Sequence, residues 1–161
     1  MGERGFSLVE LLIIMALMGI LMTIATLSWQ EMRTKSYTES QIRTMHADLM
    51  SVRLQALYGK RARSVVIADQ LFKVYSSSDT SVSPIESKKL TYPTVSNVSG
   101  ALVFDAQGLL NGNQRSICIL PTNDTSVVNA AAVDSLVVSQ TRINLGKRTE
   151  GNCKSENIEQ K

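Results

Sequence analysis

One carboxylate lies in a segment that is otherwise apolar. The 22 residues Phe6–Leu27 carry a single charged side chain, Glu10. A charge at the centre of a membrane-embedded helix costs roughly 2.5–3.5 kcal/mol on insertion scales, so such a residue indicates a function and requires a partner. An α-amino group created by cleavage near Phe6, on a neighbouring copy of a packed helix, would supply the cation. Glu10 therefore predicts ion pairing between subunits.

The chain has two cysteines, Cys118 and Cys153, 35 residues apart. An even count beyond a membrane span fits an oxidising periplasm and one disulfide. In the chain-entropy model, closing this loop contributes on the order of 3–4 kcal/mol. The tail from Thr149 has almost no apolar residue except Ile158, so we expect the bridge to hold it to the rest of the protein. The alternative is two free thiols, with Cys118 simply buried.

No other group of residues predicts catalysis or metal binding. His46 is the only histidine, so the chain lacks a credible zinc set, and we expect no metal and no cofactor. The sequence contains no P-loop, nucleophile elbow, HExxH or dinucleotide fingerprint. Asp105, Asp124 and Asp134 fall at expected turns, where aspartate commonly caps the backbone. We therefore expect that the protein is not an enzyme.

The apolar segment predicts a helix that spans a membrane. Twenty-two helical residues reach roughly 33 Å, close to the hydrocarbon thickness of about 30 Å. A removable secretory signal is one alternative, but nothing after Leu27 resembles an Ala-x-Ala site. A plain anchor is the other, and it does not account for Glu10.

Beyond this span the pattern predicts that the helix continues. Residues 30–57 contain no proline or glycine, and apolar residues recur at steps of three and four, at Ile42, Met45, Leu49, Val52 and Ala56. We expect one helix over residues 6–58, with residues 6–27 in the membrane and the second half packed on a globular body. Gly59 is the expected C-cap, and Glu39 and Arg43 are an expected (i, i+4) pair.

Residues 60–161 predict a body made of short β-strands. Residues 64–68 and 71–75 read as a hairpin and residues 76–87 as an exposed loop. About seven strands are expected in all, the others near Lys89–Tyr92, Ala101–Phe104, Ser116–Leu120, Ser135–Ser139 and Thr141–Leu145. The fold class is thus α+β, a long N-terminal helix packed on a small antiparallel sheet or sandwich.

The start of the chain resembles a known export signal. The run from Gly5 to Leu12, with Phe6 after the glycine and Glu10 five residues into the apolar helix, resembles the class III signal of type IV pilins and type II secretion pseudopilins. The resemblance implies that residues 1–5 are a leader cut after Gly5 by prepilin peptidase and that Phe6 is N-methylated. It also implies that Glu10 pairs with the N-terminal amine of an adjacent subunit.

The same resemblance implies the location and the partners. The chain would cross the bacterial inner membrane once, with its C-terminal domain in the periplasm. It would assemble through the N-terminal helix with other pilins or pseudopilins on an inner-membrane platform driven by a cytoplasmic ATPase.

Two features of the sequence indicate which branch of this family the chain resembles. Major pilins usually carry a proline near the end of the apolar stretch, whereas the first proline here is Pro84. This difference favours a minor pilin or pseudopilin. The order of strands and glycines over residues 101–148 is similar to the GspH/FimT branch, which implies a subunit that primes or caps assembly. The sequence does not separate a type IV pilus from a type II secretion pseudopilus.

A second function hypothesis is DNA binding for DNA uptake. Some FimT-like proteins bind DNA, and here the basic residues Arg142, Lys147, Arg148 and Lys154 would contact phosphates. The DNA-binding branch has a Gly-Arg-x-Arg pattern, whereas residues 146–149 read Gly-Lys-Arg-Thr. The alternative is a solvated basic tail, and the net charge of +3 is too small to require nucleic acid as a partner.

Overall fold

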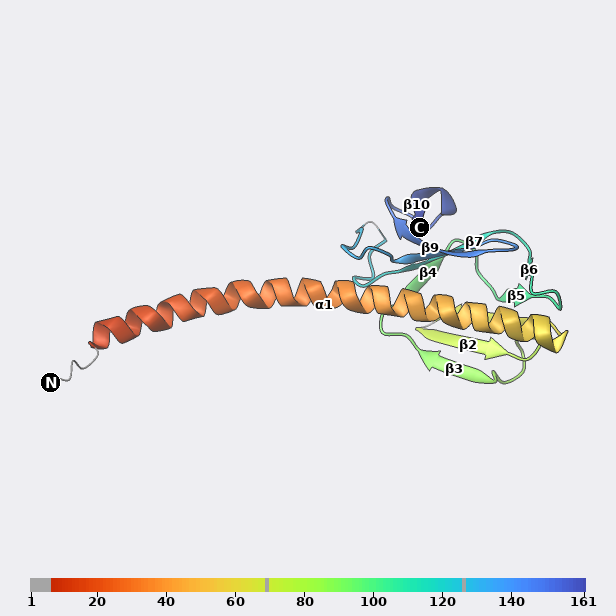
Figure 1. The fold of residues 1–161 in the computed structure, drawn as a ribbon, viewed down its shortest axis with the longest axis horizontal. Coiled ribbons are helices and arrows are strands. Elements are labelled where there is room, and N and C mark those ends of the chain that lie inside the picture. The colour runs from red at the N-terminus through yellow and green to blue at the C-terminus, as the bar shows by residue number, and fades with distance from the viewer. Residues whose placement is uncertain (1–6, 69, 126) are drawn as a thin grey trace. The chain divides into compact units, whose positions relative to one another are not determined.

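The computed structural model describes residues 7–68, 70–125 and 127–161, and the side chains among these except at 24–27 (Figure 1). The helix α1 spans Leu8–Gly59. The strands are β1 (Arg63–Ala68), β2 (Leu71–Tyr75), β3 (Glu86–Lys89), β4 (Thr94–Ser96), β5 (Leu102–Phe104), β6 (Leu110–Asn111), β7 (Arg115–Ile119), β8 (Ser135–Val138), β9 (Ile143–Arg148) and β10 (Ile158–Gln160), and a short 3₁₀ helix covers Ser155–Asn157.

The helix α1 runs without a break for 52 residues, as the absence of proline predicts. The helix ends at Gly59, the expected C-cap position. The left-handed residue is Lys60 (φ 51°), and the Arg61 amide donates to the Ala56 carbonyl at 3.3 Å. This is the six-to-one bond of a Schellman cap. Gly59 is the last helical residue and does not take the left-handed conformation.

By its internal contacts the chain divides into residues 1–34 and 35–161. In the first unit, the described part of the chain is almost entirely helix. Among the described residues, α1 is the one helix that is long and apolar enough to cross a membrane, with a mean hydropathy of 2.5 over its most apolar window. The second unit contains the remainder of α1 and all the described strands, so residues 35–59 belong to the body.

Two antiparallel five-stranded sheets form the second unit. One has the order β3-β2-β1-β5-β6 and the other β10-β9-β8-β7-β4. The expected hairpin is present, with β1 paired to β2 so that Ile67 lies opposite Phe72. Gln70 takes a positive φ of 58° in its turn. The fold is therefore α+β, one long helix packed on two antiparallel sheets.

Several strand boundaries differ from the sequence predictions. Residues 76–87 were expected to be a loop, but β3 begins at Glu86, and the strand expected near residues 89–92 is replaced by β3 and β4. The strands β6 and β10 were not expected. These segments are two to four residues long, too short to show a period of two, and their neighbours in the sheets determine their structure.

The core of the second unit lies between α1 and the two sheets. All five residues of the predicted helical stripe, Ile42, Met45, Leu49, Val52 and Ala56, are buried. They share one cluster with side chains of both sheets, including Phe72, Phe104, Ile117 and Leu136. Figure 1 shows this part of α1 with β2 and β3 on one side and β4, β7 and β9 on the other.

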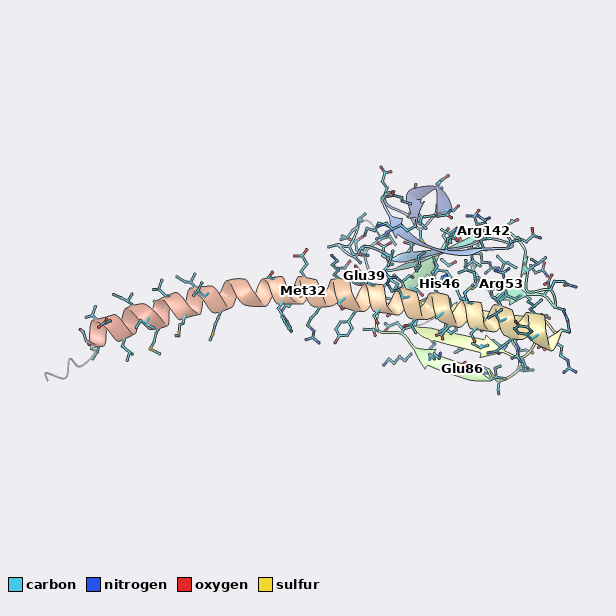
Figure 2. All side chains as sticks on the ribbon, in the orientation of Figure 1. Met32, Glu39, His46, Arg53, Glu86 and Arg142 are labelled. Carbon is cyan, nitrogen blue, oxygen red and sulfur yellow. A yellow bond between two sulfur atoms is a disulfide. The ribbon has the colours of Figure 1, made fainter. Side chains whose placement is uncertain are left out.

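A second stripe on α1 is polar and bonds to the loops and strands of the body. Glu39, His46 and Arg53 are seven residues apart and so share a helix face (Figure 2). Glu39 Oε1 accepts from the Ala132 amide at 2.7 Å, His46 Nε2 lies 3.0 Å from the Ile143 carbonyl, and Arg53 Nε donates to the Gly108 carbonyl at 2.7 Å.

This polar stripe corrects the expected pair of Glu39 and Arg43. In the described structure Glu39 bonds to a backbone amide of the body and makes no ion pair with Arg43, whose side chain is exposed. Gln41 on the same helix makes two hydrogen bonds to the backbone of Tyr92. Its side chain donates to the Tyr92 carbonyl at 2.9 Å and accepts from the Tyr92 amide at 2.8 Å. Sequence spacing found the apolar face of the helix but not these partners, which are 51 to 97 residues away.

Candidate functional site

The candidate site begins at Glu10, which lies in the first turn of α1. Its side chain is exposed, between exposed Val9 and Leu11. The first turn of a helix carries partial positive charge from its unpaired N–H groups, so a carboxylate is favoured there. The predicted cleavage and methylation residues, Gly5 and Phe6, lie outside the described residues.

The helix that carries Glu10 exposes apolar side chains around its whole circumference. The large apolar residues from Leu8 to Met22 are all exposed, by 40% at Ile14 to 77% at Leu8. Figure 2 shows side chains projecting on all sides of this part of α1. A helix that is apolar all round requires lipid or other helices as its surroundings. The segment is therefore built to be covered by something other than water.

The two cysteines are joined in a disulfide. Cys118 on β7 and Cys153 in the tail have Cα atoms 5.8 Å apart, and both residues are buried. Val137, Ile158 and partly buried Val95 pack around the bridge. The interpretation favoured from the sequence, one bridge between β7 and the tail, is what the structure contains.

The bridge is not the only connection between the tail and the body, contrary to the sequence expectation. The strand β10 pairs with β9, with Ile158 opposite Arg148 and Gln160 opposite Gly146. The Lys161 amide donates to the Leu145 carbonyl at 2.9 Å. A polar tail can add a strand because the pairing uses backbone groups and needs only one apolar anchor, here Ile158.

The predicted basic cluster does not form one exposed patch. Arg148 is completely buried, and its guanidinium donates to the carbonyls of Thr125, Val127 and Gly151 at 2.5–2.9 Å. Lys147 forms an ion pair with Asp134 at 2.9 Å. These two cations hold the loop before β8 and the tail, so their charges are directed into the protein.

The other two members of the cluster are exposed. Arg142 lies at the turn before β9, where its amide donates to Ser139 Oγ at 3.2 Å (Figure 2). Lys154 lies 3.5 Å from Glu156 and is partly neutralised by it. Only Arg142 and Lys154 thus keep the solvent exposure that contact with phosphate requires.

Asp134 is the important residue that the sequence analysis assigned incorrectly. It was expected to cap a turn, but its side chain is fully buried beside Lys147. Its carboxylate also accepts from Ser135 Oγ, the Arg148 amide and Asn129 Nδ2 at 2.6–2.9 Å. The only signal in the sequence was its place directly before the apolar run 135–138. Asp105, by contrast, caps its turn as expected, accepting from the amides of Gln107 and Leu109.

A partly exposed ion-pair cluster joins α1 to β3. Lys88 Nζ lies 2.7 Å from Asp48 Oδ1 and 3.2 Å from Glu86 Oε1. The hydrogen bond to Asp48, assisted by Glu86, raises the pKa of Lys88 above its usual value. In the loop before β3, the pKa of Asp79 is lowered because its carboxylate accepts from the Ser81 hydroxyl and amide.

Comparisons with known proteins agree with this geometry. Residues 1–26 match the model of the prokaryotic N-terminal methylation motif. Two crystal structures of the type IV minor pilin FimU from Pseudomonas aeruginosa are similar in fold. One has 21% identity and a TM-score of 0.51, covering 73% of this chain and 96% of FimU, and the other has 20% identity and a TM-score of 0.53, covering 74% and 92%. A comparison with curated proteins gave no match.

The motif and the fold concern different parts of the chain. The methylation motif covers residues 1–26 and includes the exposed, apolar beginning of α1. The body into which α1 continues has a fold similar to that of FimU.

Proposed function

We propose that this chain is a minor subunit of a type IV pilus. Prepilin peptidase cuts it after Gly5, Phe6 becomes the N-methylated terminus, and the apolar helix holds the chain in the bacterial inner membrane with its body in the periplasm. An inner-membrane platform then moves it into the filament, where it primes or caps assembly.

The observation that carries this proposal is the lone carboxylate at the head of an apolar helix that no part of the described structure covers. The described side chains of residues 8–22 are all exposed, and Glu10 is their only charge. Such a surface is stable in lipid and equally stable among other helices of its kind. The same segment therefore serves as an anchor before assembly and as a packing surface afterwards.

Glu10 gives the assembly step its specificity. When the helix moves from lipid into a bundle, the carboxylate enters a medium of low dielectric and needs a cation within a few ångströms. The N-terminal amine of a neighbouring subunit is a cation that processing itself creates. A subunit displaced along the bundle axis would leave both charges unpaired, so the pair fixes the axial position.

The minor role and the pilus assignment have their own support. The apolar helix lacks the proline typical of major subunits. The structures with a similar fold are of a protein described as a type IV minor pilin. Assembly into a type II secretion pseudopilus is the competing outcome, and a gene neighbourhood with other pseudopilins and no retraction ATPase would favour it. We propose a structural role without catalysis, the energy for assembly coming from a separate ATPase.

The test replaces Glu10 in cells and measures incorporation into sheared filaments. We expect Glu10→Ala and Glu10→Gln to be processed and methylated but nearly absent from filaments, because neither variant can pair with an amine. Glu31→Ala is the matched control, since Glu31 is the next acidic residue on the same helix and lies beyond the apolar span. Normal incorporation of both Glu10 variants, or a purified subunit that still begins with Met1, would contradict the proposal.

A further inference from the structure

The only tryptophan of the chain lies just beyond the apolar segment of α1. Trp29 is 62% exposed, and the polar residues Gln30 and Glu31 follow it. Met32, one turn further on the same face, is 64% exposed. Tryptophan combines a large apolar ring with one N–H donor and is enriched where hydrocarbon meets water. In the described structure Trp29 is not part of a buried core. Its ring is therefore suited to an external partner that is apolar on one side and polar on the other.

The spacing between Trp29 and Glu10 matches the thickness of a membrane. Trp29 lies nineteen positions after Glu10, and at about 1.5 Å per residue the two are roughly 28 Å apart along the helix. The hydrocarbon core is about 30 Å thick. If Trp29 lies at one boundary of the hydrocarbon, Glu10 lies at the other, where a carboxylate reaches water and the cost of its charge is much smaller than at the centre.

A competing register would place Thr23 at the boundary, because it is the first polar side chain after a long apolar run. Thirteen residues, about 20 Å, would then separate the boundary from Glu10, and the carboxylate would lie about 10 Å inside the hydrocarbon. That register would be needed only if the Thr23 hydroxyl required water as a hydrogen-bond partner. Thr23 Oγ1 donates to the Gly19 carbonyl at 2.8 Å, so its hydroxyl is satisfied within the helix and does not require water.

We propose that Trp29 binds the interface between lipid headgroups and acyl chains and thereby sets the depth of the helix in the bilayer. Before assembly, Trp29 lies at the periplasmic boundary and Glu10 is held at the cytoplasmic boundary. The carboxylate is then hydrated while the subunit waits, and it loses that water only when it meets an amine in the filament. This inference rests on the proposed membrane anchoring and adds the register of the helix to it.

The single tryptophan allows a direct measurement of depth. The full chain is reconstituted into phosphatidylcholine vesicles in which lipids carry bromine either near the headgroup end or near the terminal end of the acyl chains. Flotation first establishes that the chain enters the vesicles. We expect Trp29 fluorescence to be quenched most by the bromine nearest the headgroup. In the matched variant Trp29→Phe/Thr23→Trp, six residues or about 9 Å deeper, the deeper bromine should quench most.

The outcomes separate the register from the anchoring. A chain that floats but whose Trp29 is quenched only by aqueous iodide, and by neither brominated lipid, would overturn the proposed register and leave the anchoring intact. Strongest quenching of Trp29 by the deep bromine would overturn it as well. A chain that does not float with the vesicles contradicts the anchoring itself. The reversed order of quenching in the two proteins supports the inference.

Discussion

At the scale of single residues, Asp134 and Arg148 are two charged groups that each make several hydrogen bonds inside the protein. Both are completely buried, and they join β8, β9, the preceding loop and the tail. In the sequence, Arg148 belongs to a run of basic residues at the start of a polar tail, which is typical of a solvated surface. Its burial follows from tertiary structure: β10 pairs with β9 beside it, and three backbone carbonyls from the loop before β8 and from the tail surround the guanidinium. No local pattern contains that information.

Removing the Arg148 guanidinium is therefore expected to destabilise the fold. In Arg148→Met, three carbonyls lose a charged donor inside the protein, and we expect a loss of about 3 kcal/mol in the free energy of unfolding. Urea unfolding of the purified chain measures it. Arg142→Met is the control, because Arg142 is exposed and its change should be close to zero. Equal effects of the two substitutions would contradict the structural role of Arg148.

The ion pairs of Lys88 predict that the stability of the fold decreases at high pH. Because the pKa of Lys88 is raised in the folded protein, the protonated amine favours folding. Its contribution is complete below the unfolded pKa of about 10.4 and is lost as the pH rises through the folded pKa. Lys88 is 42% exposed, so the contribution is small.

The measurement compares unfolding free energies of the wild type and Lys88→Met at about pH 8 and at about pH 12, on either side of the ordinary lysine pKa. At the lower pH we expect the wild type to be more stable than Lys88→Met. At the higher pH we expect the two proteins to have the same free energy of unfolding. Lys89→Met, on the same strand but without an ion pair in the described structure, should show no such trend. A difference that grows with pH would contradict the assignment.

At the scale of elements, the sequence predicted those with a sustained period and not the short ones. The stripe from Ile42 to Ala56 predicted the packed face of α1, and the β-branched runs predicted the first hairpin. The strands β4, β6 and β10 have two or three residues each and no period to detect. The polar stripe Glu39, His46 and Arg53 was not found because its partners are distant backbone groups.

The end of α1 gives a test at this scale. Gly59 is helical, and a Cβ atom there would meet no atom within 4 Å. We therefore expect Gly59→Ala to raise the free energy of unfolding by about 0.5–1 kcal/mol, through lower entropy of the unfolded chain. Thermal or urea unfolding measures the change.

Gly108→Ala provides the opposite case for comparison. Gly108 has φ +74°, and an added Cβ would lie 3.3 Å from Leu57 Cβ and 3.4 Å from the Arg53 carbonyl. This substitution should destabilise the protein, because the conformation is strained and the helix is close. If Gly59→Ala were the destabilising change instead, Gly59 rather than Lys60 would be the left-handed residue.

At the scale of the whole molecule, the disulfide joins β7 to the tail and closes a covalent loop between residues 35 positions apart. The chain-entropy model gives it about 4 kcal/mol. We expect the double variant Cys118→Ala/Cys153→Ala to lose most of that amount in urea unfolding, while β10 pairing persists in part because it uses backbone bonds. Two thiols alkylated in unreduced periplasmic protein would show instead that the bridge does not form in the cell.

The organisation of the whole molecule could be inferred further than the details of its site. The long apolar helix at the head of the chain was predicted from residue types alone and is confirmed, because the length and hydropathy of such a segment depend on local composition. The docking role of Glu10 stays a prediction. The basic residues could not be assigned in this way. Whether a cation faces solvent or backbone carbonyls depends on which distant segments fold against it, here the loop before β8 and the tail.

The four strands at the sheet edges have a consequence for the behaviour of the protein at high concentration. None of β3, β4, β6 and β10 is longer than four residues. The longest, β3, carries Glu86, Lys88 and Lys89. Short, charged borders offer little template for joining sheets from separate molecules, the reaction that leads to amyloid-like aggregates. At high concentration the protein is thus protected from precipitating through its β-strands.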